Sequence, residues 1–308
     1  MLFFILFGAQ AMADEWHISG GGEFNARAIG VMNAGYRTER WSVQLFTDTV
    51  EVRTDRELDR GRFWVAGRLE AIAAGLLNSP WMDGAPALEQ AVNAGYAGVE
   101  GGWQRYLPWG FYVGVQGFAR YYFFFEAPTT TVSVPAPRER LQGEVVLGWW
   151  TEQVQASLTA GGQISQGPQP HIRGQLSGRM PWTVSPTGSL LMGWGSDQDF
   201  LTRTRLGGLN PYVVPLAGAG WAEFLVEDYA AIRLGPSVQT DWLHMDLVAD
   251  LAWFDDQSAA GVGVLSRFQP TERRGFVEIN LGYAPWLARQ PNIGRGSLWL
   301  LAGLDWGR

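Results

Sequence analysis

The chain has no cysteine, no lysine and only three histidines among its 308 residues. Without cysteine there is no disulfide framework, thiol nucleophile or thiolate metal site. The histidines, His17, His171 and His244, are too few for a histidine-rich metal centre. All 23 basic residues are arginine, and 30 acidic residues leave a net charge of −7, which argues against the basic surface that a nucleic-acid partner needs. We therefore expect no metal, no cofactor and no nucleic-acid partner.

Charged residues and long apolar runs are also scarce. Charged residues make up 17% of the chain, against a usual value of about 25%. No segment beyond the N-terminus approaches the roughly 18 consecutive apolar residues of a transmembrane helix. Glycine and aromatic residues are abundant instead, with 40 Gly, 16 Trp and 16 Phe. Since only helices and closed barrels satisfy the backbone in lipid, a chain of this composition would have to cross a membrane as a β-barrel.

The N-terminus has the pattern of an export signal. Residues Leu2 to Phe7 are all apolar, and Ala11-Met12-Ala13 places small residues two apart before Asp14. This pattern predicts a secretory signal peptide over residues 1–13, followed by a β-barrel over 14–308. The alternative is that the apolar run forms a first strand or a buried helix.

Period-two alternation runs along the rest of the chain. Between Trp242 and Phe254 the odd positions are apolar, while the even positions carry His244, Asp246 and Asp250. The stretches 61–74, 109–126 and 274–285 alternate in the same way, which predicts antiparallel strands with one apolar and one charged face. Such strands also occur in soluble sandwiches. Lengths of ten to sixteen residues favour tilted membrane spans over soluble strands of about 5–6 residues.

Aromatic residues gather near the predicted strand ends, where the interfacial girdles of membrane barrels lie. They are Trp103, Tyr106, Trp109, Tyr121 to Phe125, Trp149, Trp150, Trp286, Trp299 and Trp306. The sequence thus predicts an all-β, transmembrane antiparallel barrel in the outer membrane of a Gram-negative cell.

Fourteen strand segments can be counted, and a missed hairpin would give sixteen. They are 22–37, 40–53, 61–74, 90–104, 109–126, 138–151, 154–165, 170–180, 188–196, 221–235, 242–254, 258–268, 274–285 and 296–306. The segment 14–28 could hide a further strand. An even number of strands places both termini at the same end of the barrel, which we expect to be the periplasmic end with the short turns. The long loops, including 197–220, then lie at the other end.

The longest loop carries a family resemblance. Gly207 and Gly208 are followed by Leu209, Asn210, Pro211 and Tyr212, and five predicted strands follow the loop. This arrangement resembles the outer-membrane assembly and two-partner-secretion transporter superfamily, or bacterial surface antigen family. The segments 246–254, 260–268 and 277–283 are similar to its later strands. The resemblance covers the last third of the chain and implies that 197–220 folds into the lumen.

The sequence departs from that family in two ways. The family's inward loop carries an Arg-Gly-aromatic motif, but here no arginine lies between Gly207 and Trp221, and Arg203 and Arg205 precede the glycines. The usual attachment of the loop to the wall is therefore in question. No segment before the first strand is long enough for periplasmic polypeptide-binding modules, so the resemblance implies a barrel-only member.

The charged face of the strands supplies the candidate site residues. We predict a lumen charge network of Arg68, Glu70, Arg120, Arg173, Arg179, His244, Asp246, Asp250 and Glu278. Within one strand, positions four apart are about 13 Å apart, too far to share a metal or a proton. Pairing across strands could bring Glu278 close to the aspartates as an acidic cation site. A charge-paired wall is the simpler interpretation.

These features suggest a transport or assembly component that engages lipid and either a polypeptide client or other membrane proteins. The alternative is a porin-like passive channel for small solutes. A barrel lipase would need serine and histidine together on the lipid-facing rim, but Ser177 and His171 lie six positions apart on the polar face, and there is no Gly-x-Ser-x-Gly elbow. We expect no catalytic residues. A loop seated in the lumen would favour the transporter, and an open lumen the porin.

Overall fold

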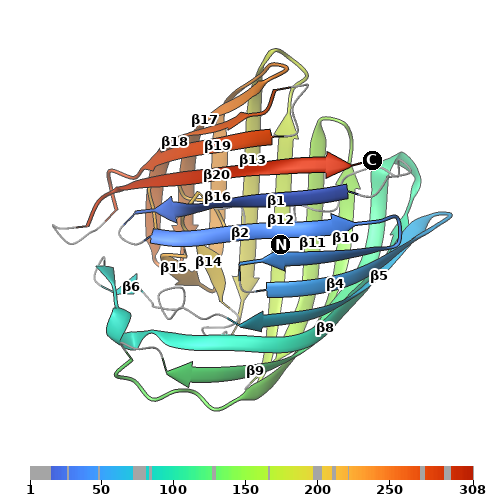
Figure 1. The fold of residues 1–308 in the computed structure, drawn as a ribbon, viewed down its shortest axis with the longest axis vertical. Coiled ribbons are helices and arrows are strands. Elements are labelled where there is room, and N and C mark those ends of the chain that lie inside the picture. The colour runs from blue at the N-terminus through green and yellow to red at the C-terminus, as the bar shows by residue number, and fades with distance from the viewer. Residues whose placement is uncertain are drawn as a thin grey trace.

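The computed structural model shows a closed antiparallel β-barrel of sixteen strands (Figure 1). It describes residues 15–25, 28–47, 49–71, 81–82, 85–126, 130–165, 167–196, 203–209, 213–220, 222–270, 275–287 and 293–307. The predicted signal peptide, 1–13, lies outside these residues. No helix in the described part of the chain is long and apolar enough to cross a membrane.

Each wall strand pairs with its neighbours along the chain, and the first pairs with the last. The wall strands are β1 (Glu15–Phe24), β2 (Ala28–Arg37), β3 (Trp41–Phe46), β4 (Thr49–Leu58), β5 (Gly61–Ala71), β8 (Val92–Tyr106), β9 (Phe111–Glu126), β10 (Arg138–Trp150), β11 (Val154–Ile164), β12 (Pro168–Arg179), β13 (Val184–Gly195), β16 (Tyr229–Gln239), β17 (Leu243–Phe254), β18 (Gln257–Phe268), β19 (Gly275–Tyr283) and β20 (Gly296–Gly307). Ten consecutive residue pairs, from Glu15↔Gly307 to Phe24↔Leu298, join β1 to β20.

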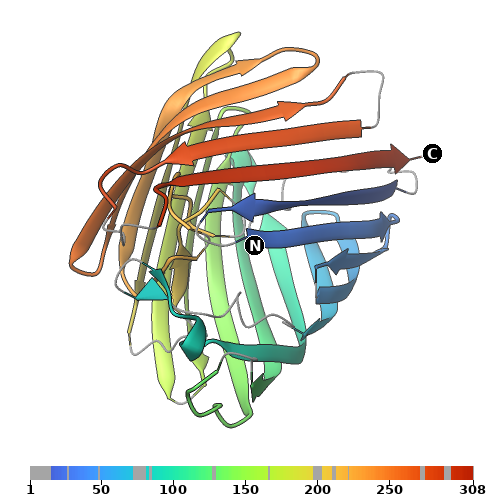
Figure 2. The same cartoon turned by 60° about the vertical axis from the view of Figure 1, so that its left-hand side comes forward.

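The remaining elements are short. Strands β6 (Trp81–Met82) and β7 (Ala85–Pro86) pair with each other, and so do β14 (Thr204–Leu206) and β15 (Phe224–Val226). Two 3₁₀ turns, η2 (Leu88–Gln90) and η3 (Pro108–Gly110), flank β8. The pair β14–β15 lies within the ring of strands (Figures 1 and 2).

The predicted fold class is confirmed, and sixteen is the correct strand number. The single segment predicted at 22–37 contains the end of β1 and all of β2, and the segment at 40–53 contains β3 and the first part of β4. The stretch 14–28 does contain an extra strand, β1. The wall strand predicted from Trp221 begins only at Tyr229, because residues 224–226 form β15 instead.

The two barrel ends differ, because the long connections all lie at one end, as expected, although that end also has short turns such as 47–48 and 255–256. Residues 59–60, 107–110, 151–153 and 240–242 are short connections at the end where β1 begins and β20 finishes. The connections 127–137, 196–228 and 284–295 lie at the other end. Both ends of the barrel wall therefore meet at the short-turn end.

The outer face is apolar and carries two belts of exposed aromatic residues. The short-turn belt contains Trp16, Trp41, Phe63, Trp103, Trp109, Phe111, Trp182, Trp242 and Phe268, and the long-loop belt contains Phe24, Tyr121, Phe125, Trp194, Trp253, Tyr283 and Trp286. Leu247 and Leu251 are exposed between Asp246, Val248 and Asp250, so outward side chains alternate with lumenal ones. This outer face is that of a barrel crossing a bilayer.

Trp299 does not belong to either belt. Its side chain is only 2% exposed and packs with Leu209 and Ala217 inside the barrel. The prediction that Trp299 lies at the membrane interface is therefore wrong. The side chain of Trp306 lies outside the described residues.

Candidate functional site

The segment between β13 and β16 folds into the lumen, and we call residues 203–228 the lumenal loop. Leu206, Leu216 and Ala219 are fully buried, and they pack against Ala252 and Phe254 of β17. Because wall residues surround these loop side chains, the loop occupies space that sixteen strands otherwise leave open.

Glycines allow the loop to double back on itself. Gly207 and Gly208 have φ of 113° and 106°, in the left-handed region that only glycine adopts readily. The amide of Gly207 donates to the carbonyl of Val214 (2.9 Å), and the amide of Gly208 to that of Leu216 (3.3 Å). The glycine pair noticed in the sequence therefore begins the compact part of the loop. Asn210, Pro211 and Tyr212 lie outside the described residues.

The loop is attached to the wall through its backbone. The amide of Ala217 donates to Oδ2 of Asp250 (2.7 Å), and the amide of Gly218 donates to Oγ of Ser297 (3.1 Å). Arg233 holds the Asp250 carboxylate with two contacts of 2.6 and 2.7 Å. A bidentate arginine fixes the orientation of that carboxylate, and a hydrogen bond to a charged acceptor is stronger than a neutral one.

Three glycines of the wall make room for the loop. A Cβ at Gly261 would lie 1.9 Å from the carbonyl oxygen of Ala217, and one at Gly282 would lie 2.4 Å from the amide nitrogen of Gly218. A Cβ at Gly263 would lie 3.2 Å from that of Ala217. Only glycine permits this close approach at the first two positions. We call Asp250, Gly261, Gly263, Gly282 and Ser297 the seat.

Arginines hold the base of the loop as well. Arg203 pairs with Glu227 at 2.8 Å, across the two ends of the loop. Arg205, on β14, lies close to Glu70, Tyr96 and Tyr122 of the opposite wall. Burial lowers the pKa of the Arg205 guanidinium, and the Glu70 carboxylate acts against that shift. The loop is therefore attached without an arginine between Gly207 and Trp221.

The other predicted network residues lie in cross-strand contacts. Arg68 is 3.6 Å from Glu51, and Arg120 is 2.9 Å from Glu100. Arg173 lies near Glu144, which accepts hydrogen bonds from Gln116 (2.6 Å) and His171 (2.7 Å). Glu70 bonds the Tyr96 hydroxyl, and Arg179 lies near Asp246.

The acidic residues considered for a cation site do not come together. His244 contacts Asp246 at 3.0 Å, whereas Asp250 contacts Arg233 and the lumenal loop. Glu278 pairs with Arg267 on β18 at 3.1 Å. Among the described residues, no three potential metal-binding side chains form a group. His171 bonds Glu144, while Ser177 lies opposite Gln155 and Ser189.

Sequence reasoning missed the partners Glu51, Glu100 and Glu144 and most of the seat. The three acids occupy inward positions of alternating strands, so the alternation could have found them. Gly261, Gly263, Gly282 and Ser297 had no such signal, because their role depends on a loop distant in the sequence.

Comparison with known proteins gives a fold but no close relative. No family model and no curated protein matches the sequence. CdiB from Acinetobacter baumannii is similar in structure, with a TM-score of 0.65 and 8% identity over 97% of this chain and 60% of that one. BamA from Haemophilus ducreyi lacking POTRA domains 1–3 has a TM-score of 0.66 and 9% identity over 97% of this chain and 71% of that one.

These likenesses bear on the barrel alone. They confirm, at the level of the fold, the resemblance to assembly and two-partner-secretion barrels predicted from the sequence. The chain spans 60% of the CdiB structure, which is less than two thirds of it.

Proposed function

We propose that this chain is an outer-membrane transport or assembly barrel that handles polypeptide and is closed at rest by its lumenal loop. The observation that carries the proposal is the seat, where Asp250 and Ser297 hold the amides of Ala217 and Gly218 against glycine-lined wall. A specific attachment of this kind suits a loop with a defined closed position. The proposal assigns no catalytic chemistry to the barrel.

Two further observations support this proposal. The outer face, with its two aromatic belts, suits an outer-membrane barrel. The barrel also resembles those of CdiB and BamA over 97% of this chain. Transport through the barrel would require the loop to leave the seat, which breaks the hydrogen bonds of Ala217 to Asp250 and of Gly218 to Ser297.

A passive diffusion channel is the second candidate. The wall opposite the seat carries cross-strand pairs such as Glu51–Arg68 and Glu100–Arg120, and charged walls of this type set ion preference in porins. In this alternative the lumenal loop narrows the pore but leaves a permanent path beside it. The two candidates therefore differ in whether the resting barrel conducts.

A two-part experiment tests the proposed function. Liposomes containing the intact barrel should not swell in small sugars, whereas swelling would favour the diffusion channel. In planar bilayers, a barrel in which an Asn-Gly turn replaces residues 207–223 should be blocked reversibly by an unfolded polypeptide. A folded protein of equal mass is the control, because its diameter is larger than the width of the lumen and it cannot enter. If the unfolded polypeptide does not reduce the current through this open variant, the proposal that the barrel handles polypeptide is contradicted.

A further inference from the structure

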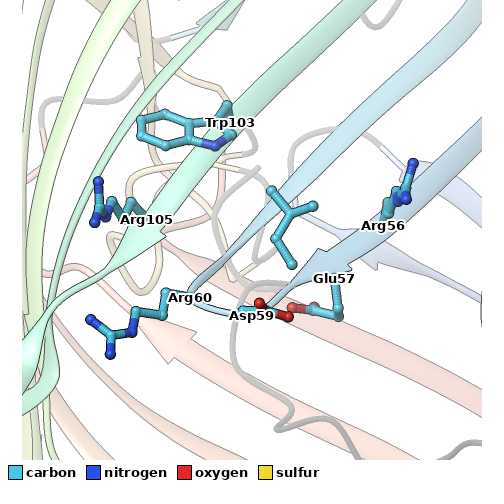
Figure 3. Close-up of a pocket in the computed structure, with 7 residues that line it drawn as sticks. Arg56, Glu57, Asp59, Arg60, Trp103 and Arg105 are labelled. Carbon is cyan, nitrogen blue, oxygen red and sulfur yellow. The ribbon is translucent and has the colours of Figure 1, made fainter.

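A cleft of about 660 Å³ lies at the short-turn end, around the turn that joins β4 to β5. Its lining includes Arg56, Leu58, Asp59, Arg60, Trp103 and Arg105. Figure 3 shows Arg60 and Arg105 on the same side of the cleft, with the Trp103 ring beside them and Arg56 farther off. Neither the lumenal loop nor the seat contributes to this cleft.

The strand register shows that the cleft opens on the outer face. Arg56, Phe63 and Trp103 form one row across β4, β5 and β8, because Arg56 pairs with Phe63 and Phe63 pairs with Trp103. The exposed fractions of Phe63 and Trp103 are 43% and 38%, and both belong to the short-turn aromatic belt. The cleft therefore lies where membrane headgroups meet the barrel.

A buried glycine lies beside the cleft. In the row nearest the turn, Gly61 lies between Leu58 and Arg105. Because Gly61 has no side chain, only backbone separates these two side chains. A Cβ at this position would lie 2.1 Å from the carbonyl oxygen of Gln104, so a larger residue does not fit without a backbone shift.

The arginines of the cleft differ from their inward neighbours on the same hairpin. Arg53 and Arg62 face the lumen, and both pair with Asp55, at 3.0 and 2.6 Å. Arg56, Arg60 and Arg105 are exposed, and no side chain in the described part of the chain neutralises them by an ion pair. The lining also contains two acids, Asp59 and Glu57, and Glu57 is 3.8 Å from Arg62, so the three cleft arginines outnumber the acids.

We propose that this cleft binds the phosphate headgroup of an anionic phospholipid in the periplasmic leaflet. Arg60 and Arg105 hold the phosphate oxygens, for which guanidinium groups are well shaped. Leu58, in the row nearest the turn, lies at the level of the glycerol, and Trp103 and Phe63, one row deeper in the membrane, contact the start of an acyl chain. Basic residues at the membrane surface favour anionic over zwitterionic headgroups.

Native mass spectrometry of the purified barrel tests the site. Phosphatidylglycerol and phosphatidylcholine with identical acyl chains are each added to the intact barrel and to the Arg60→Gln/Arg105→Gln double variant. The matched control is Arg37→Gln/Arg40→Gln, which removes the same charge at the neighbouring 38–40 turn from two residues that do not line the cleft. Migration on gels before and after heating verifies that each variant is folded.

The intact barrel and the control should bind phosphatidylglycerol about tenfold better than phosphatidylcholine. The Arg60→Gln/Arg105→Gln barrel should bind the two lipids equally. A lack of preference in the intact barrel, or an equal loss in the control, would overturn the proposal. Inorganic phosphate provides a further arm: if it binds alone and displaces the lipid at millimolar concentration, the site takes free phosphate and the lipid assignment is wrong.

Discussion

The backbone amide of Ala217 and the carboxylate of Asp250 are joined by a 2.7 Å hydrogen bond that connects the lumenal loop to strand β17. The same carboxylate receives both Arg233 contacts, and its residue is only 2% exposed. One buried acid therefore serves two partners, one in the wall and one in the loop. Loss of its charge should affect the stability of the wall and the position of the loop together.

Replacing Asp250 tests this connection. Asp250→Ala should lower the free energy of unfolding by about 3–5 kcal/mol, because it leaves the partly buried Arg233 without its partner. It should also release the Ala217 amide, so that open-channel events become frequent. Urea unfolding followed by gel mobility and single-channel recording are the measurements.

Asp250→Asn is the matched control. Its amide oxygen can still accept from the Ala217 amide, while the charge facing Arg233 is lost. We expect instability similar to that of Asp250→Ala but far fewer open events. Equal conductance in the two variants would show that the Ala217 hydrogen bond does not hold the loop.

Gly261→Ala should displace the loop without changing any charge. The added Cβ would lie 1.9 Å from the carbonyl oxygen of Ala217, so the tip of the loop has to move. Single-channel recording should show open events that the intact barrel lacks. Gly67→Ala is the control, because nothing lies within 4 Å of a Cβ there. If a folded Gly261→Ala barrel shows no open events, the claim that the loop closes the barrel by packing against the seat is contradicted.

The Glu100–Arg120 pair gives a prediction about the opposite wall. Glu100 is 5% exposed, and Arg120→Gln would leave its carboxylate buried without its cation. We expect a loss of about 3–5 kcal/mol in the free energy of unfolding, measured in urea. The double variant Glu100→Gln/Arg120→Gln should recover most of it, since no unpaired charge remains. Arg203 forms a more exposed pair with Glu227. Arg203→Gln should therefore lower the free energy of unfolding by less than about 1 kcal/mol.

The fold was predictable because the bilayer imposes a simple rule on each strand. Apolar residues such as Leu247 and Leu251 face lipid, and Asp246 and Asp250 face the lumen. The strand count was harder to obtain. Residues 25–27 and 47–48 join β1 to β2 and β3 to β4 with no proline or glycine, so a single Asn25 or Asp48 is the only local turn signal at each.

The candidate site was only partly predictable for a similar reason. Gly207 and Gly208 could be identified because a glycine pair before a long loop is a local pattern. Gly261 and Gly282 resemble any strand glycine until Ala217 and Gly218 are placed against them. Trp299 was misplaced because an aromatic residue near a strand end fits the interface and the lumen equally well.

The most direct test of the central claim is single-channel conductance of the intact barrel beside the variant in which Asn-Gly replaces residues 207–223. That replacement joins Leu206 to Phe224, which already pair across β14 and β15, through a two-residue hairpin turn. If the lumenal loop closes the barrel, the intact chain is silent and the variant gives a large, steady current. A steady current of equal size in both would contradict the claim.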